Sequence, residues 1–182
     1  MNYTYAAGQI PAELEPLLRE LARDYPLAPA GAESVGATLV FQSGAPAGGV
    51  EVHRAAGTST LRYDQPARAG RGVGIVLGGW MKDGQTHREQ CPFETFGIML
   101  DCSRNAVVRP EHFELWLRRL ALLGYDTAML YTEETYEIPG EDYFGYLRGR
   151  FTAAELKDIN DYARSLGIEM IGCIQTLGHL EQ

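Results

Sequence analysis

The sequence predicts an α/β protein in which a small N-terminal α/β region precedes an open sheet of parallel strands. Three apolar runs of strand length lie within 97–105, 128–137 and 169–180. Helical patterns over 110–123 and about 153–166 separate these runs. Because strand and helix alternate, we expect the three strands to pair in parallel through right-handed crossovers.

Both helices of this half have well-defined ends. Pro110 suits a first helical turn, and Gly124 follows the last apolar residue of that helix. The second helix begins with the capping-box sequence Thr152-Ala-Ala-Glu155 and ends at Gly167. Apolar stripes run along the helices at Phe113, Trp116, Leu117, Leu120 and Leu123, and at Leu156, Ile159, Ala163 and Leu166. The strands lack clean alternation, which predicts a sheet buried on both faces.

The first half contains shorter elements. An amphipathic helix is expected over 10–25, and short strands over 37–43, 49–57 and 58–64 are expected to form an antiparallel meander. A helix or strand follows over 66–80.

This last segment is rich in glycine. Its Gly72-x-Gly74 pair suggests a nucleotide-binding loop, but Leu77 stands where the third glycine should be. A turn that leads into a buried apolar segment is therefore the favoured interpretation. The polar segment 81–94 is expected to separate two domains, with residues 1–90 in the first and 91–182 in the second.

Composition excludes several classes of protein. The net charge of −8 and the lack of a basic cluster argue against nucleic acid as a partner. The irregular spacing of Cys91, Cys102 and Cys173 fits free thiols in a reducing compartment and does not match a zinc site. With neither a signal-peptide pattern nor an apolar run of membrane-spanning length, the chain is expected to be cytoplasmic and to have no membrane partner.

The βα region is short for a closed barrel, which needs roughly 250 residues. The 182 residues are therefore expected to be the N-terminal portion of a longer protein, cut after the third parallel strand. A truncated sheet has unpaired strand edges, which predicts self-association through them.

Parallel pairing would bring polar residues to one rim of the sheet, where such sheets bind ligands. The candidates at this rim are Asp101, Arg104, Glu133, Glu134, Gln175 and His179. A long connection over 132–151 adds carboxylates and four aromatic rings, Tyr136, Tyr143, Phe144 and Tyr146. Aromatic rings with carboxylates suit a sugar, although most of these rings are expected to anchor the loop.

Three segments carry a resemblance to a known family. GIMLDCSRN, AMLYTEETYEIPGEDYFGYLRGRF and IQTLGHLEQ resemble the family 20 glycoside hydrolases, the β-N-acetylhexosaminidases, and most of all their bacterial intracellular N-acetylglucosaminidase branch. The resemblance spans roughly residues 95–182. It implies a small N-terminal α+β domain followed by the first strands and helices of a TIM (β/α)8 barrel that forms the catalytic domain.

The resemblance also implies residue roles. Arg104 matches the arginine that hydrogen-bonds the hydroxyls of the terminal sugar, with Asp101 and Glu134 as further substrate-binding candidates. Glu133 and His179 match residues that support the acid/base carboxylate. Many members have Asp-Asp where Glu133-Glu134 stands, so these two glutamates could exchange roles. From the residues alone, Arg104 could instead be a surface arginine paired with Asp101.

The implied reaction is hydrolysis of terminal β-linked N-acetylglucosamine or N-acetylgalactosamine with retention, in which the substrate's acetamido oxygen attacks the anomeric carbon. No metal or organic cofactor is implied. The family's catalytic Asp-Glu pair follows the fourth strand and is not in this sequence, so the isolated chain is expected to be inactive. A non-catalytic carbohydrate-binding or interaction module, and a barrel enzyme acting on another small metabolite, remain as alternatives.

Overall fold

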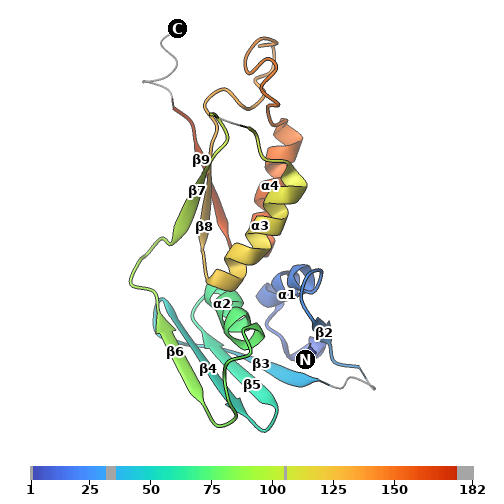
Figure 1. The fold of residues 1–182 in the computed structure, drawn as a ribbon, viewed down its shortest axis with the longest axis vertical. Coiled ribbons are helices and arrows are strands. Elements are labelled where there is room, and N and C mark those ends of the chain that lie inside the picture. The colour runs from blue at the N-terminus through green and yellow to red at the C-terminus, as the bar shows by residue number, and fades with distance from the viewer. Residues whose placement is uncertain (1, 32–35, 105, 176–182) are drawn as a thin grey trace.

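The computed structural model describes residues 2–31, 36–104 and 106–175, which form two sheets that follow each other along the long axis of the molecule (Figure 1). The strands of the first sheet are β1 (Tyr3–Tyr5), β2 (Leu27–Pro29), β3 (Ala37–Ser43), β4 (Gly49–Ala55), β5 (Thr58–Tyr63) and β6 (Thr86–Gln90). Its helical elements are η1 (Ala7–Gln9), η2 (Ala12–Leu14), α1 (Glu15–Leu21) and α2 (Pro66–Leu77). The second sheet contains β7 (Gly97–Asp101), β8 (Thr127–Tyr131) and β9 (Glu169–Cys173), with the helices α3 (Pro110–Leu123) and α4 (Ala153–Ser165). Along these described stretches, no helix is both long and apolar enough to cross a membrane.

The first sheet has the strand order β2-β1-β3-β5-β4-β6, so the predicted antiparallel meander is wrong. β4 and β5 do form an antiparallel hairpin, but β3 pairs in parallel with β5 and not with β4. The hairpin closes through Ala56 and Gly57, whose φ angles of +49° and +76° suit a two-residue turn between twisted strands. The longer connection between β3 and β4 allows the chain to pass the position that β5 later fills.

Three strands of this sheet were not predicted: β1, β2 and β6. β6 lies within 81–94, the segment expected to be a linker, and it pairs antiparallel with β4 at the edge of the sheet. Polar residues are common on edge strands because they discourage pairing with other chains. The helix expected over 10–25 is shortened to η2 and α1, because Pro16 cannot donate a backbone hydrogen bond and so lies in the first turn of α1.

The glycine-rich segment is the helix α2 and not a turn. A Cβ atom on Gly70 would lie 2.6 Å from the carbonyl oxygen of Ala121, and one on Gly74 would lie 2.1 Å from that of Leu122. These glycines therefore let the backbones of α2 and α3 touch. Gly72 and Gly74 lie inside the helix, so they form no phosphate-binding loop.

The second sheet confirms the predicted parallel pairing, in the order β7-β8-β9. α3 begins at Pro110 and is followed by Gly124, whose φ of +82° is left-handed. α4 has the complete capping box, in which Thr152 and Glu155 bond each other's backbone N–H. The sheet with its two helices is consistent with part of a TIM barrel.

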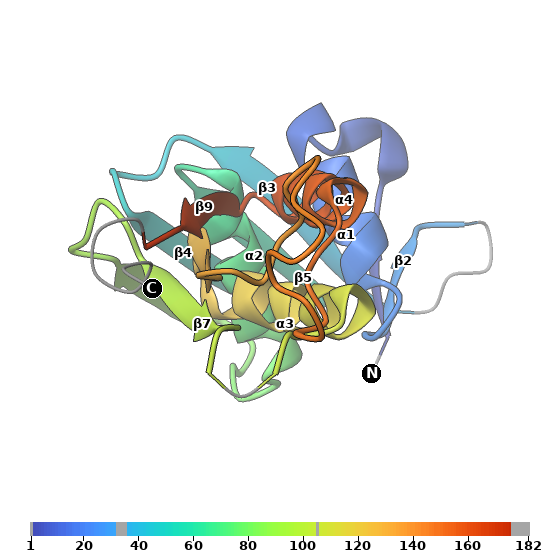
Figure 2. The same cartoon turned by 90° about the horizontal axis from the view of Figure 1, so that it is seen from above.

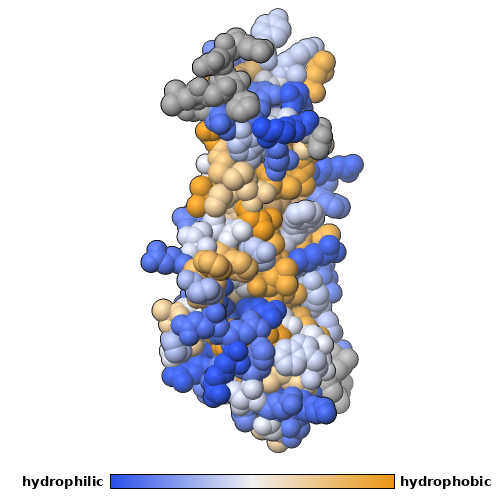
Figure 3. Space-filling model, turned by 60° about the vertical axis from the view of Figure 1, so that its left-hand side comes forward, coloured by the Kyte–Doolittle hydropathy of each residue, from blue (hydrophilic) through white to orange (hydrophobic). Residues whose placement is uncertain are grey.

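One face of this sheet is exposed, so the prediction that both faces are buried is wrong. α3 and α4 lie on the same side of the sheet (Figure 1). On the other side, Met99 is 59% exposed and Ile171 is 38% exposed. Figure 3 shows apolar residues gathered over this middle part of the molecule. Trp116 and Leu123 of the predicted α3 stripe are exposed as well.

Two buried arginines connect the parts of the chain. Arg118 of α3 donates from Nε to Asp24, which follows α1, and from Nη1 to the hydroxyl of Tyr162 in α4 at 2.6 Å. Arg68 of α2 donates from Nη2 to Asp126, before β8, at 2.8 Å. Buried side chains of both halves form one continuous core. The division into domains near residue 90 stays a prediction.

Candidate functional site

The candidate site lies at the carboxyl ends of the three parallel strands. Asp101, Tyr131 and Cys173 end β7, β8 and β9, and the strand register places these three residues side by side. Successive residues of a strand point to opposite faces, so the three side chains share one face of the sheet. This is the face that α3 and α4 leave uncovered.

The turn after β7 is organised around Asp101. Its Oδ1 accepts hydrogen bonds from the backbone N–H of Ser103 at 2.9 Å and from the Ser103 hydroxyl at 2.7 Å. Its Oδ2 accepts one from Nη1 of Arg104 at 2.6 Å. The Ser103 hydroxyl, and next Arg104, hold the pKa of the Asp101 carboxyl well below its usual range. The carboxylate therefore stays charged and orients the arginine.

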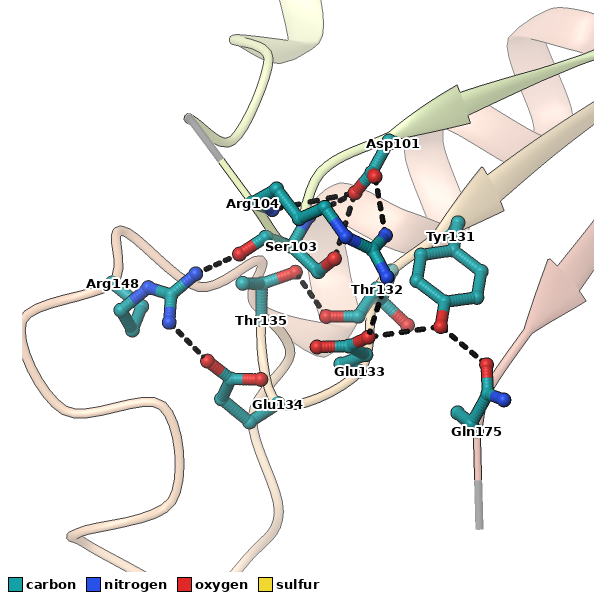
Figure 4. A network of polar contacts seen from close by, with 10 residues as sticks. All are labelled: Asp101, Ser103, Arg104, Tyr131, Thr132, Glu133, Glu134, Thr135, Arg148 and Gln175. Atoms are coloured by element: carbon teal, nitrogen blue, oxygen red, sulfur yellow. Dashed lines mark hydrogen bonds and ion pairs between the residues drawn. The ribbon is translucent and has the colours of Figure 1, made fainter. Parts of the chain in front are cut away.

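Arg104 stands between two carboxylates. Besides Asp101, its Nη2 lies 3.7 Å from Oε1 of Glu133, and its guanidinium carbon lies 5.3 Å from the centre of the Tyr131 ring (Figure 4). The Arg104 side chain is exposed, so part of its donor fork faces solvent. The hydroxyl groups of a polar ligand can accept hydrogen bonds from such exposed donors and donate hydrogen bonds to the neighbouring carboxylates.

Glu133 has an unusual backbone conformation. Its φ of +46° lies in the left-handed region, which residues other than glycine seldom adopt. Its carboxylate accepts a hydrogen bond from the Tyr131 hydroxyl at 2.8 Å. The same hydroxyl contacts the side-chain amide of Gln175, two residues after β9. Loss of water around the ring, and then the Glu133 carboxylate, raise the pKa of Tyr131.

Glu134 points to a different partner. Its carboxylate forms an ion pair with Nη1 of Arg148, whose Nη2 donates to the backbone carbonyl of Ser103. Figure 4 shows Glu133 turned toward Arg104 and Glu134 turned toward Arg148. In this structure Glu133 is therefore the glutamate nearer the candidate sugar-binding arginine, while Glu134 joins the long loop to the turn that carries Arg104.

The loop 132–151 rises above the helices and not above the exposed face of the sheet (Figures 1 and 2). Tyr136 and Phe144 pack edge to face with ring centres 5.2 Å apart, and both are half-buried. Tyr143 and Tyr146 are exposed. Only two of the four rings therefore anchor the loop, fewer than expected.

The structure brings Asp101, Arg104 and Glu133 together, with Gln175 beside them through Tyr131. His179 lies outside the described residues. Sequence reasoning missed Tyr131 and Arg148 as members of this cluster. Tyr131 could have been found because it is the last residue of an apolar strand, whereas nothing local to Arg148 indicates that it returns to Ser103.

Among the described residues, no group of three or more His, Cys, Asp or Glu side chains could hold a metal ion.

No protein-family model matches the sequence, and no curated protein matches it either. Among solved structures, the chain is similar to a family 20 exo-β-N-acetylglucosaminidase from Vibrio harveyi in complex with N-acetylglucosamine. The TM-score is 0.67 at 17% identity, over 94% of this chain and 32% of that one. It is also similar to a Streptomyces plicatus N-acetyl-β-hexosaminidase in complex with thio-NAglucal, with a TM-score of 0.70 at 20% identity, over 94% of this chain and 41% of that one.

A third similar structure is a β-N-acetylhexosaminidase from Bacteroides fragilis, with a TM-score of 0.62 at 14% identity over 94% of this chain and 40% of that one. At these identities the similarity establishes a shared fold. The chain thus has the fold of part of the β-N-acetylhexosaminidases. It spans between 32% and 41% of the length of these three solved proteins.

Proposed function

We propose that this chain is the N-terminal part of an exo-acting β-N-acetylhexosaminidase and that it supplies one wall of the sugar site. The observation that carries the proposal is the cluster of Asp101, Arg104 and Glu133 at the carboxyl ends of three parallel strands. The fold shared with solved β-N-acetylhexosaminidases, two of them in complex with N-acetylglucosamine or thio-NAglucal, supports this assignment.

In this proposal Arg104 binds the terminal sugar. Its planar fork offers several fixed donors, which suit two adjacent hydroxyls of a sugar ring. Asp101 orients the fork through its ion pair, and Glu133 can accept a hydrogen bond from a sugar hydroxyl or from a catalytic group beside it. Glu134 and Arg148 position the surrounding loop.

The reaction proposed for the complete enzyme removes a terminal β-linked N-acetylglucosamine or N-acetylgalactosamine with retention. The substrate's acetamido oxygen attacks the anomeric carbon while a glutamic acid protonates the leaving oxygen. The Asp-Glu pair for these steps would follow a fourth parallel strand, and the sequence of 182 residues does not include it. We therefore expect this chain alone to bind sugar without hydrolysing it.

The test is hydrolysis of an aryl β-N-acetylglucosaminide by the product of the complete reading frame, with the matching aryl β-glucoside as the control substrate. Hydrolysis of the first substrate alone is the expected result. Arg104→Gln should reduce kcat/KM by roughly tenfold to a hundredfold, because a charge-assisted hydrogen bond to the sugar is lost. Arg109→Gln, at an exposed arginine five positions along the chain, is the matched control.

Sugar binding with no turnover by the complete product would support a carbohydrate-binding module instead. The exposed pair of Tyr143 and Tyr146, with ring centres 6.1 Å apart, is the observation that favours this second function. Turnover by the purified 182-residue chain would contradict the division of roles proposed here.

A further inference from the structure

A cleft of about 410 Å³ opens at the opposite end of the parallel strands from Asp101. The residues that line it belong to α2, β6, the segment 91–96 and the end of α3, with Tyr125 just after that helix. Phe96 immediately precedes β7, and Tyr125 lies just before β8, so the cleft is at the amino ends of these strands. Its volume is within the range typical of small-molecule sites, roughly 300–1,000 Å³.

Three aromatic rings form a row in this cleft. The rings of Phe93 and Phe96 lie 6.3 Å apart at an angle of 13°, and those of Phe96 and Tyr125 lie 4.3 Å apart at 17°. The outermost ring, Phe93, is 60% exposed. A row of nearly parallel rings with an open end offers a flat apolar surface to a further ring.

The lining of the cleft also includes polar groups. Arg71 donates from Nε and Nη2 to the two carboxylate oxygens of Glu89, each at 2.7 Å. His87 lies 2.9 Å from the same carboxylate. Both members of the Arg71–Glu89 pair are partly exposed, so donor and acceptor atoms stand side by side at the cleft.

A largely buried network holds the backbone at Phe96, the middle ring of the row. Asp126 accepts a hydrogen bond from the backbone N–H of Phe96 at 2.7 Å and forms an ion pair with Arg68 at 2.8 Å. The Arg68 side chain is 4% exposed and also lines the cleft. Its Nε–H has no hydrogen-bond acceptor among the described residues, which leaves one buried donor unsatisfied. The network fixes Phe96 independently of any ligand.

The charges of the cleft decide which class of ligand suits it. Arg71 is paired with Glu89, and Arg68 is paired with Asp126, so neither guanidinium is left as an uncompensated positive charge. An anion would therefore gain little from this cleft. A saccharide has an apolar ring face that can stack on an aromatic ring. Its hydroxyls can accept hydrogen bonds from Arg71 and donate them to Glu89.

We propose that this cleft is a second binding site, specific for neutral saccharides of one or two rings, with the sugar stacked on Phe93 and its hydroxyls bonded to Arg71 and Glu89. The proposal does not depend on the function of the Asp101–Arg104 rim. The cleft would hold a saccharide apart from the rim, whether or not the complete protein hydrolyses it.

The test is an NMR titration of the 182-residue chain with N,N′-diacetylchitobiose and with cellobiose, with glucuronate as the anionic probe. We expect a neutral disaccharide to shift the amide signals of Glu89, Phe93, Phe96 and Tyr125, and glucuronate to leave them unchanged. Phe93→Ala should weaken this binding roughly threefold to tenfold, the range expected for loss of one aromatic contact. Because Phe93 is exposed, this variant should keep its fold, which circular dichroism checks.

Two further variants separate the cleft from the rim. Tyr146→Ala removes a ring of the loop 132–151 that is about as exposed as Phe93, and it should leave saccharide binding in the cleft unchanged. Arg104→Gln should also leave it unchanged, even if the rim loses its sugar. The proposal is overturned if neither disaccharide shifts the cleft signals at millimolar concentration, if Phe93→Ala binds as well as the original chain, or if glucuronate binds more tightly than the neutral sugars.

Discussion

Asp101 and Arg104 form an ion pair of 2.6 Å across the turn that follows β7. The same carboxylate accepts two hydrogen bonds from Ser103, so one side chain shapes the turn and orients the arginine that it carries. Both members of the pair are exposed, and an exposed ion pair contributes little to stability. The main effect of the pair is to orient the guanidinium of Arg104.

Replacement of Asp101 should therefore affect ligand binding more than folding. We expect Asp101→Asn to weaken sugar binding at the rim about tenfold, because the guanidinium of Arg104 loses the nearer of its two charged partners, with only a small change in Tm. Calorimetric titration and thermal unfolding measure the two effects. Asp161→Asn, which breaks an exposed pair with Lys157 on α4, is the matched control and should leave sugar affinity unchanged. Equal affinities for the two variants would contradict this role of Asp101.

Gly74 should not tolerate a side chain. A Cβ atom there would stand 2.1 Å from the carbonyl oxygen of Leu122, a backbone atom that cannot turn aside. Gly74→Ala should therefore lower the free energy of unfolding by about 1–3 kcal/mol, although alanine favours an isolated helix. Urea unfolding measures the change. Gly8→Ala, where the added Cβ would meet no atom within 4 Å, should be close to neutral. A stabilised Gly74→Ala variant would show that α2 and α3 do not touch at this point.

The β4–β5 hairpin carries strain that a substitution can remove. Ala56 has a φ of +49°, which costs an L-residue with a side chain roughly 1–2 kcal/mol. Asparagine tolerates this conformation and commonly precedes glycine in such turns. Ala56→Asn should raise the free energy of unfolding by about 0.5–1 kcal/mol. Ala55→Asn, one residue earlier in β4, should lower it, because asparagine is disfavoured in strands. A loss of stability in the first variant would contradict the turn geometry.

Glu89 should contribute to the acid sensitivity of the fold. The bidentate bond from Arg71, and then the neighbouring His87, lower the pKa of Glu89 from 4.5 to about 2. A carboxyl group with a lowered folded-state pKa stabilises the protein above its unfolded-state pKa, and this stabilisation is lost as the pH falls through the folded-state value. The difference in unfolding free energy between the original chain and Glu89→Gln should thus be constant above about pH 5 and shrink toward pH 2. Chemical unfolding at a series of pH values checks this, and a difference that does not change with pH would refute it.

Local sequence signals were sufficient to predict several elements of the fold. The ends of α3 and α4 follow from Pro110, Gly124 and the Thr152–Glu155 capping box, because each of these signals acts within one helical turn. The parallel order of β7, β8 and β9 follows from the alternation of strand and helix, which leaves few other topologies. The approach of Asp101, Arg104 and Glu133 follows in turn, since the carboxyl ends of parallel strands meet at one edge.

Local patterns of residues therefore specify the ends of α3 and α4, the parallel βα order and the rim at which the polar residues collect. Long-range packing establishes that β3 pairs with β5, that the glycines of α2 accommodate α3, and that Glu133 turns to Arg104 while Glu134 turns to Arg148. It also decided which face of the parallel sheet the helices leave open. The physical reason is the same in each case: these contacts join residues far apart in the chain, or select between adjacent side chains of the same type, and no local pattern of residues records such a choice.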